Sequence, residues 1–270
     1  VHVNKQAAPL SQGEIAMLEE DDGFAIVARK VAMSHPLLGG RSSDRVNMEN
    51  STIAQRSAAL TTLQTLKDMS KQYLGSMDEY ASWKVKGRLL PVRPSSEHLS
   101  QGIQEFNELW NRIGNLPSLM EIQRGKSTAD MRRFSFEKNP GDGHMLFRPI
   151  GQIALARAVS ALLKRGKSLD QIFAKLDQLD RQGGFKLDDP SNVWYGVLYD
   201  PSGQRMRIAG RDTAADLLAY LVMGEPDDAL REDLTERFRD ARLIDGNQDL
   251  YRGFDGNPIE RMKLDLPPSL

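Results

Sequence analysis

The sequence predicts a mainly α-helical fold, a multi-helix domain with one small β-hairpin. Apolar residues recur at helical spacing through most of the 270 residues. Residues that cap or stop helices flank these segments. One segment, residues 192–199 (NVWYGVLY), is instead rich in aromatic and β-branched side chains and precedes a turn at residues 200–203. We therefore expect this segment to pair with residues 204–208 as the hairpin.

The first half of the chain carries clear helix-start and helix-stop residues. Ser11 with Glu14 has the spacing of a capping box, and Asp21 or Asp22 can begin the second helix. That helix ends before Pro36, because proline cannot continue it. Gly75 and Gly114 are stops for the later helices. The expected helices cover residues 11–18, 21–34, 57–74, 77–84 and 95–114.

The second half begins after the strongest loop signal of the sequence, residues 139–143 (NPGDG). Pro149 suits the first turn of a helix that runs to Lys164. Gly166 ends this helix and Ser168 opens the next one, which gives a helical hairpin. Two more helices follow, near residues 212–223 and 227–241. We expect three units: residues 1–10 as the end of a truncated module, and two helical subdomains over residues 11–138 and 139–270.

The composition limits the classes of function. The 36 basic and 37 acidic residues leave a net charge of −1, so any DNA contact must come from a local basic patch. The absence of cysteine excludes disulfides, thiolate zinc sites and a cysteine nucleophile. The sequence has no apolar run of membrane-spanning length, no signal peptide and no initiator methionine. We expect a cytoplasmic protein cut from a longer polypeptide, with no membrane contact.

Three basic clusters are candidates for DNA contact, with an ordinary solvated helix surface as the alternative for each. Phosphate contact requires lysine or arginine side chains that are free to approach the nucleic acid. The clusters are Lys84, Lys86, Arg88 and Arg93; Arg124, Lys126, Arg132 and Arg133; and Arg157, Lys164, Arg165 and Lys167.

Catalytic motifs are not supported by the sequence. Gly125-Lys126-Ser127 looks like the end of a phosphate-binding loop, but Met120 stands where that motif requires glycine. The four histidines are scattered, without metal-ligand spacing or a partnering carboxylate pattern. No serine lies in a Gly-x-Ser-x-Gly elbow. We expect no catalytic residue and no metal ion in this chain.

Arg148 and Gln152 lie where the helix after the loop begins. An arginine just before Pro149 can bind a carboxylate or phosphate near the free backbone amides of the helix start. The alternative is a structural ion pair that orients the loop. If Arg148 binds a ligand, its replacement by lysine weakens DNA or partner binding and leaves the fold intact. Trp194-Tyr195 also has two alternative roles, as part of the packed core or as an exposed platform for stacking.

An ordered series of segments resembles the DGQHR-domain family of DNA sulfur-modification proteins, the DndB family. Residues 1–11 (VHVNKQAAPLS) resemble its F-x-N-x-N-K-T-A-K-P-L-S segment. Residues 20–25 (EDDGFA) and 46–49 (VNME) match its E-D-D-x-x-A and V-N-x-E stretches. Further matching segments are FRPIGQ (147–152), LARA (155–158), LLKRGKSLDQI (162–172), Leu179-Asp180, WYGVL (194–198) and the helix led by Arg211.

This resemblance implies a DNA-binding transcriptional repressor that accompanies DNA phosphorothioate modification. Its partners would be duplex DNA of the modification-operon promoter, subunits of the modification complex, and a second copy of the chain. The family also implies a ParB/sulfiredoxin-like N-terminal module that carries the Asp-Gly-Gln-His-Arg signature, which is absent here. Asn4 and Lys5 would then lie beside its nucleotide or phosphate pocket. ATP or another nucleotide would bind the intact protein, and no cofactor would bind this portion alone.

A protein–protein scaffold for a modification or restriction complex is the alternative function. The near-zero net charge favours it over direct DNA contact.

Overall fold

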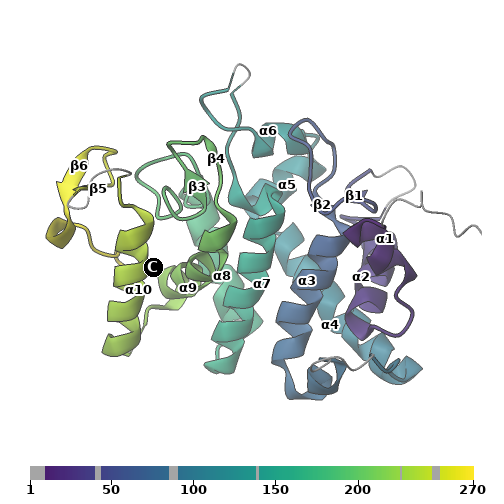
Figure 1. The fold of residues 1–270 in the computed structure, drawn as a ribbon. Coiled ribbons are helices and arrows are strands. Elements are labelled where there is room, and N and C mark those ends of the chain that lie inside the picture. Colours follow the sequence, from purple (N-terminus) through teal and green to yellow (C-terminus); the bar gives the residue numbers. More distant parts are fainter. Residues whose placement is uncertain (1–9, 40–43, 85–90, 138–139, 226, 245–249) are drawn as a thin grey trace, which may run out of the picture.

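A computed structural model describes residues 10–39, 44–84, 91–137, 140–225, 227–244 and 250–270. The predicted mainly α-helical class is confirmed, and the strands form only small pairs (Figure 1). The α-helices are α1 (Gln12–Leu18), α2 (Gly23–Ser34), α3 (Leu63–Tyr73), α4 (Ser96–Gly114), α5 (Pro117–Gln123), α6 (Thr128–Arg132), α7 (Pro149–Lys164), α8 (Leu169–Arg181), α9 (Arg211–Met223) and α10 (Asp228–Ala241).

Short 3-10 helices and two-stranded ladders connect these helices. The 3-10 helices are η1 (Leu74–Ser76), η2 (Asp78–Trp83), η3 (Met145–Phe147), η4 (Ile208–Gly210) and η5 (Arg261–Lys263). Strands β1 (Val46–Asn47) and β2 (Thr61–Thr62) pair in parallel. The antiparallel pairs are β3 (Tyr199–Asp200) with β4 (Arg205–Met206), and β5 (Leu250–Arg252) with β6 (Pro258–Glu260).

Local capping residues explain where the helices begin. Ser11 and Glu14 form the predicted capping box, and the Asp22 side chain accepts hydrogen bonds from the first amides of α2. The helix predicted over residues 57–74 starts later than expected, at Leu63. Thr62 causes this, since its hydroxyl caps the amide of Thr65 while its backbone pairs with β1.

The predicted hairpin is shorter than the pattern of residues 192–199 indicated. Only Tyr199 and Asp200 pair with β4, and the preceding residues fold into turns. The amides of Val197 and Leu198 both donate to the carbonyl of Trp194, and Gly196 adopts a φ of 87°. Trp194 is fully buried and its Nε1 donates to the Gly184 carbonyl at 2.6 Å, so it is a core residue.

Helix α7 lies at the centre of the molecule, with α3 on one side and α9 on the other (Figure 1). Helix α2 packs between α3 and α4. One cluster of buried apolar side chains extends from Ala16 to Leu266, and so it crosses the boundary expected at residues 138–139. Among the described helices, none combines the length and apolar character required to span a bilayer.

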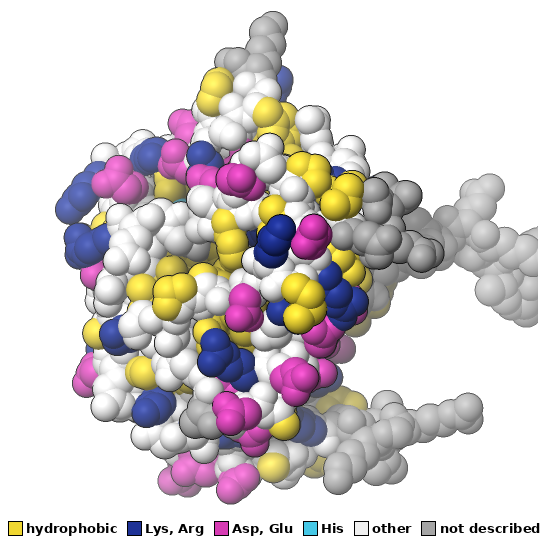
Figure 2. Space-filling model, turned by 90° about the vertical axis from the view of Figure 1, so that its left-hand side faces the viewer, with side chains coloured by type: hydrophobic (Ala, Val, Ile, Leu, Met, Phe, Trp, Pro, Cys, Tyr) yellow, Lys and Arg dark blue, Asp and Glu magenta, His cyan; other side chains and the backbone are white. Residues whose placement is uncertain are grey.

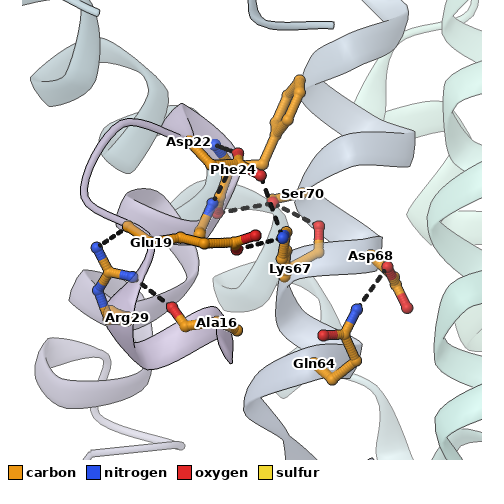
Figure 3. Close-up of polar contacts among 10 residues, drawn as sticks. Ala16, Glu19, Asp22, Phe24, Arg29, Gln64, Lys67, Asp68 and Ser70 are labelled. Carbon is orange, nitrogen blue, oxygen red and sulfur yellow. Dashed lines mark hydrogen bonds and ion pairs between the residues drawn. The ribbon is translucent and has the colours of Figure 1, made fainter. Parts of the chain in front are cut away.

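Polar contacts fasten the α1–α2 connection onto α3 (Figure 3). Lys67 of α3 forms ion pairs with Glu19 and, at 3.1 Å, with Asp22. Burial lowers the pKa of Lys67, but the two carboxylates outweigh burial and leave the pKa above its ordinary value. Arg29 donates to the carbonyls of Ala16 and Glu19. The acidic stretch after α1 therefore serves as an anchor for α3.

Candidate nucleic-acid interface

A groove of about 410 Å³ lies between the C-terminal parts of α3 and α7. These two helices pack side by side, and η1 and η2 follow directly after α3 (Figure 1). Four cationic and three polar side chains line the groove, together with one alanine. They are Lys71, Gln72, Ser76, Lys84, Arg157, Ser160, Ala161 and Lys164.

Three separate segments bring the cations of the groove together. Lys71 lies in the last turn of α3, while Arg157 and Lys164 are two helical turns apart on α7. Lys84 follows η2 and lies over Gly75, where an added Cβ would stand 2.7 Å from the Cε atom of Lys84. The small size of Gly75 thus gives the Lys84 side chain its place in the groove.

The groove wall between the helices is held by Ser160. Its hydroxyl donates to the carbonyl of Ala156 at 2.8 Å within α7 and lies 3.0 Å from the carbonyl of Gln72 on α3. Ser160 is buried, so this contact links the two helices directly beneath the cations. Lys71, Arg157 and Lys164 are therefore mounted on a packed helix pair, and Lys84 joins them from the segment after η2.

The groove is cationic, because its lining among the described residues contains no acidic side chain. Within the described part of the chain, Lys71, Lys84 and Lys164 form no ion pair, whereas Arg157 pairs with Asp212 at 2.5 Å. Asp68 lies one turn before Lys71, and burial raises the pKa of its carboxyl. Three ammonium groups are thus available to an anion.

The positions of these cations can be explained by helix stabilisation or by ligand binding. Lysines in the last turn of a helix interact favourably with the helix dipole, which explains Lys71 and Lys164 without any ligand. Lys84 and Arg157 lie outside the last turn of any α-helix, and yet they line the same groove. Helix-end stabilisation alone therefore does not explain why all four converge.

The structure separates the other predicted contact residues from this groove. Arg132 is 1% exposed, and its guanidinium donates to backbone carbonyls only. Burial, together with the charge of the neighbouring Arg148, lowers its pKa to about 10. The carbonyls that it binds belong to Phe147, Ala54, Gln55, Ser57 and Ala59. Arg132 holds the 54–59 loop against η3, and this corrects the expectation of direct DNA contact at this position.

Gln152 is likewise an internal brace. It is 3% exposed, and its amide nitrogen donates to the carbonyls of Leu60 at 2.9 Å and Leu146 at 2.8 Å. Its amide oxygen accepts from the hydroxyl of Thr61 at 2.7 Å. Because each polar atom has a partner inside the protein, Gln152 offers nothing to a nucleic acid, and the expectation of DNA contact is corrected here too.

Arg148 also points inward. Its Nη2 donates to the carbonyl of Arg132 at 2.6 Å, and its guanidinium lies 4.3 Å from the ring centre of Phe134. Burial lowers the pKa of Arg148 to about 10, opposed by the charges of Glu137 and Asp188. The geometry favours the bracing alternative, through a carbonyl and an aromatic ring.

Most of the remaining predicted cations are exposed but paired with acids. Arg124 and Lys126 lie 3.3 Å and 2.6 Å from carboxylate oxygens of Glu121 and Asp142. Arg133 pairs with Asp130, and Arg165 pairs with Glu225 at 2.6 Å. Lys167 is exposed, and Arg93 donates to the carbonyl of Glu20. Asn4, Lys5, Lys86 and Arg88 lie outside the described residues.

Two histidines, His35 and His144, have side-chain partners that the sequence did not predict. His144 Nε2 lies 3.0 Å from a carboxylate oxygen of Asp180, and His35 Nε2 lies 3.0 Å from the amide oxygen of Asn111. In both rings Nδ1 accepts from the amide two residues later. With both nitrogens occupied, neither ring is free to act as a general base. No cluster with the donors for a metal ion occurs among the described residues.

Comparison with known proteins gives no match to any family model, any curated protein or any solved structure. The relation to the DndB family therefore stays a prediction that rests on the residues quoted above.

Proposed function

We propose that the protein is a DNA-binding regulatory protein of the transcriptional-repressor type, which contacts duplex DNA through the groove between α3 and α7. The observation that carries this proposal is the convergence of Lys71, Lys84, Arg157 and Lys164 on a groove to which the described part of the chain contributes no acidic side chain. Clustered cations at fixed spacing neutralise backbone phosphates and release the counterions bound to them. The link to DNA phosphorothioate modification, and with it a cytoplasmic location, is supported by the resemblance alone.

The chemistry of the groove suits phosphates better than base edges. Lysine is a flexible, strongly hydrated point charge, and it lacks the rigid planar fork of arginine. The remaining lining, Gln72, Ser76 and Ser160, is short or half-buried. We therefore expect the groove to position the protein on the DNA backbone, with little sequence preference of its own.

The direct test measures the affinity for a promoter duplex of the modification operon as a function of salt concentration. Each phosphate contacted contributes about −0.9 to the slope of log affinity against log salt. The triple variant Lys71→Gln, Lys84→Gln, Lys164→Gln removes three unpaired cations, so its slope is expected to be shallower by roughly three.

The matched control is Lys30→Gln, Arg231→Gln, Lys263→Gln, which removes the same charge from exposed positions elsewhere. We expect this control to bind as the wild type does, apart from a small uniform change from net charge. Equal weakening of both triple variants would show that the DNA senses only overall charge, and it would overturn the assignment of the groove.

The second candidate function is a protein–protein scaffold, favoured by the surface on the α10 side. Figure 2 shows basic and acidic side chains interspersed over this face, with hydrophobic side chains between them. Leu230 of α10 is 54% exposed and Met262 of η5 is 82% exposed. A pull-down with the modification subunits distinguishes the two functions, because Leu230→Ser with Met262→Ser would abolish capture by a scaffold and leave DNA binding unchanged.

A further inference from the structure

A second hollow, of about 540 Å³, lies at the opposite end of α7 from the groove, and it combines an exposed aromatic ring with amide side chains. Three chain segments line it: residues 53–55, residues 134–137 and the β3–β4 turn, together with Arg148. A helix rises about 1.5 Å per residue, so the nine residues from Arg148 in the hollow to Arg157, the first residue of α7 in the groove, separate the two sites by about 14 Å, and they share no lining residue. The hollow therefore belongs to a different site.

The aromatic floor of the hollow is rigidly supported. Phe136 is 46% exposed, and its ring stacks on Phe134 with the centroids 5.4 Å apart and the planes at 17°. Phe134 is buried, and it packs in turn against Tyr199 at 4.8 Å and the guanidinium of Arg148 at 4.3 Å. A ring fixed in this way in an open hollow offers its area to a second flat group at a small cost in side-chain entropy.

The polar groups of the hollow are amides rather than free charges. Gln55 and Gln204 both line it, and both are exposed. Gln204 has a φ of 49°. It is the one non-glycine residue with a positive φ in the described chain, and glycine would adopt this conformation with less strain. Glutamine amides carry both donors and an acceptor, the complement of the edge of a nucleobase. The amide nitrogen of Gln55 donates one hydrogen to a carboxylate oxygen of Glu137, which orients the amide and leaves its oxygen and second N–H for a ligand.

The charges around the hollow balance, which argues against a phosphate as its ligand. Arg205 lies 3.4 Å from a carboxylate oxygen of Asp200, and Glu137 faces Arg148 across the lining. The Nε of Arg148 is buried and has no hydrogen-bond partner among the described residues, while its guanidinium lies against the ring of Phe134. The site thus presents a flat apolar face with polar edges and little net charge.

From these features we propose that the hollow binds the planar ring of an unpaired nucleobase, stacked on Phe136 with its edge toward Gln55 and Gln204. Stacking between bases and aromatic side chains tolerates any base, because every base has a π face. A base inside a duplex is covered by its neighbours, so the site selects single-stranded, looped or extruded bases. This proposal goes beyond the duplex-binding groove and does not depend on it.

The test uses the full chain and a short single strand that carries one 2-aminopurine, whose fluorescence is quenched when its ring stacks. We expect quenching at saturating wild-type protein, and no quenching when the same strand is annealed to its complement. Phe136→Ala is expected to abolish the quenching and to weaken single-strand binding on the order of ten-fold. Phe136→Tyr keeps a ring and is expected to restore both.

Met33→Ala is the matched control, since it removes an exposed apolar side chain of α2, a helix that contributes nothing to the lining of the hollow. Quenching by Phe136→Ala equal to the wild type, or no quenching by the wild type, would overturn the proposal. The latter result is expected if an aromatic side chain of a protein partner fills the hollow instead. The groove triple variant should lower the affinity for the single strand without changing the quenching at saturation. The experiment therefore tests the proposal for the hollow separately from the proposal for the groove.

Discussion

The two ends of α7 use polar side chains in opposite ways. At its N-terminal end, Arg148 and Gln152, with Arg132 beside them, donate to backbone carbonyls inside the protein. In its C-terminal half, Arg157 and Lys164 face an open groove whose described lining holds no acidic side chain. A basic residue is therefore informative about ligand binding only when its burial and its partners are known.

The chemistry of arginine and lysine explains this division. A guanidinium carries five donors in a planar fork, so one buried arginine satisfies several carbonyls that would otherwise lie unpaired. An ammonium is strongly hydrated and remains exposed on its flexible stem. Arg242 repeats the buried pattern near the C-terminus, where it is 0% exposed and donates to four carbonyls, those of Arg252, Asn192, Pro190 and Gly253.

The largest effect is expected for Arg132→Met, which removes the donors to five carbonyls, of which those of Phe147 and Ala59 are buried. Since each unpaired buried polar group costs about 1–3 kcal/mol, we expect a loss of roughly 3–5 kcal/mol in the free energy of unfolding. Urea denaturation measures this, with Arg124→Met as an exposed control expected to change stability by less than about 0.5 kcal/mol. A similarly small change in Arg132→Met would show that the loop is held by other contacts.

A smaller loss of stability is expected for Arg148→Lys. This variant tests whether Arg148 stabilises the fold or contacts DNA. Lysine cannot reproduce both the contact with the Arg132 carbonyl and the flat packing on Phe134, so we expect a loss of about 1–3 kcal/mol in stability. The folded fraction should bind duplex DNA with unchanged affinity. Weakened binding without loss of stability would instead make Arg148 a contact residue, as the sequence position alone suggested.

The sequence predicted the helices better than the sites, for a physical reason. Helix caps such as Ser11 and Asp22 act on amides two or three residues away, so their effect is visible in a short segment. The groove forms only where Lys71 and Lys84 lie beside α7. Tertiary packing between segments far apart in the sequence sets this arrangement. Lys71 belonged to none of the three clusters, and Arg132 lay in one although it is buried. Charge spacing along the chain carries no information about burial.

The pairing of His144 with Asp180 was invisible for the same reason, since 36 positions separate the two residues. The segment 192–199 misled in a different way. Its aromatic and β-branched residues favour a strand, but the tertiary environment of Trp194 and the left-handed Gly196 override that preference.

The smallest expected effect is a change of the free energy of unfolding with pH, caused by the buried His35. Burial lowers the pKa of His35, opposed by its hydrogen bond with Asn111. Above the unfolded pKa of about 6.5, both states are neutral and the histidine causes no pH dependence. As the pH falls below this value the unfolded state binds the proton first, so stability decreases until the folded pKa is passed.

Urea denaturation at pH 7.5 and at pH 5.0 checks this effect, with His35→Gln as the non-titrating variant. We expect the wild type to lose more stability than the variant between the two pH values. A variant with the same pH dependence as the wild type would assign the effect to other groups, among them Asp180. Burial raises the pKa of Asp180, but the contacts with His144 and the hydrogen bonds from Ser118 outweigh burial and keep the pKa below its ordinary value.

The most direct measurement is the salt dependence of duplex DNA binding by four proteins: the wild type, the groove triple variant, its charge-matched control and Arg148→Lys. A cationic groove at the C-terminal end of α7 and a brace at its N-terminal end predict a shallower slope, by roughly three, for the groove variant alone. Equal slopes for the wild type and the groove variant, or a reduced slope for Arg148→Lys, would contradict the division between the two ends of α7.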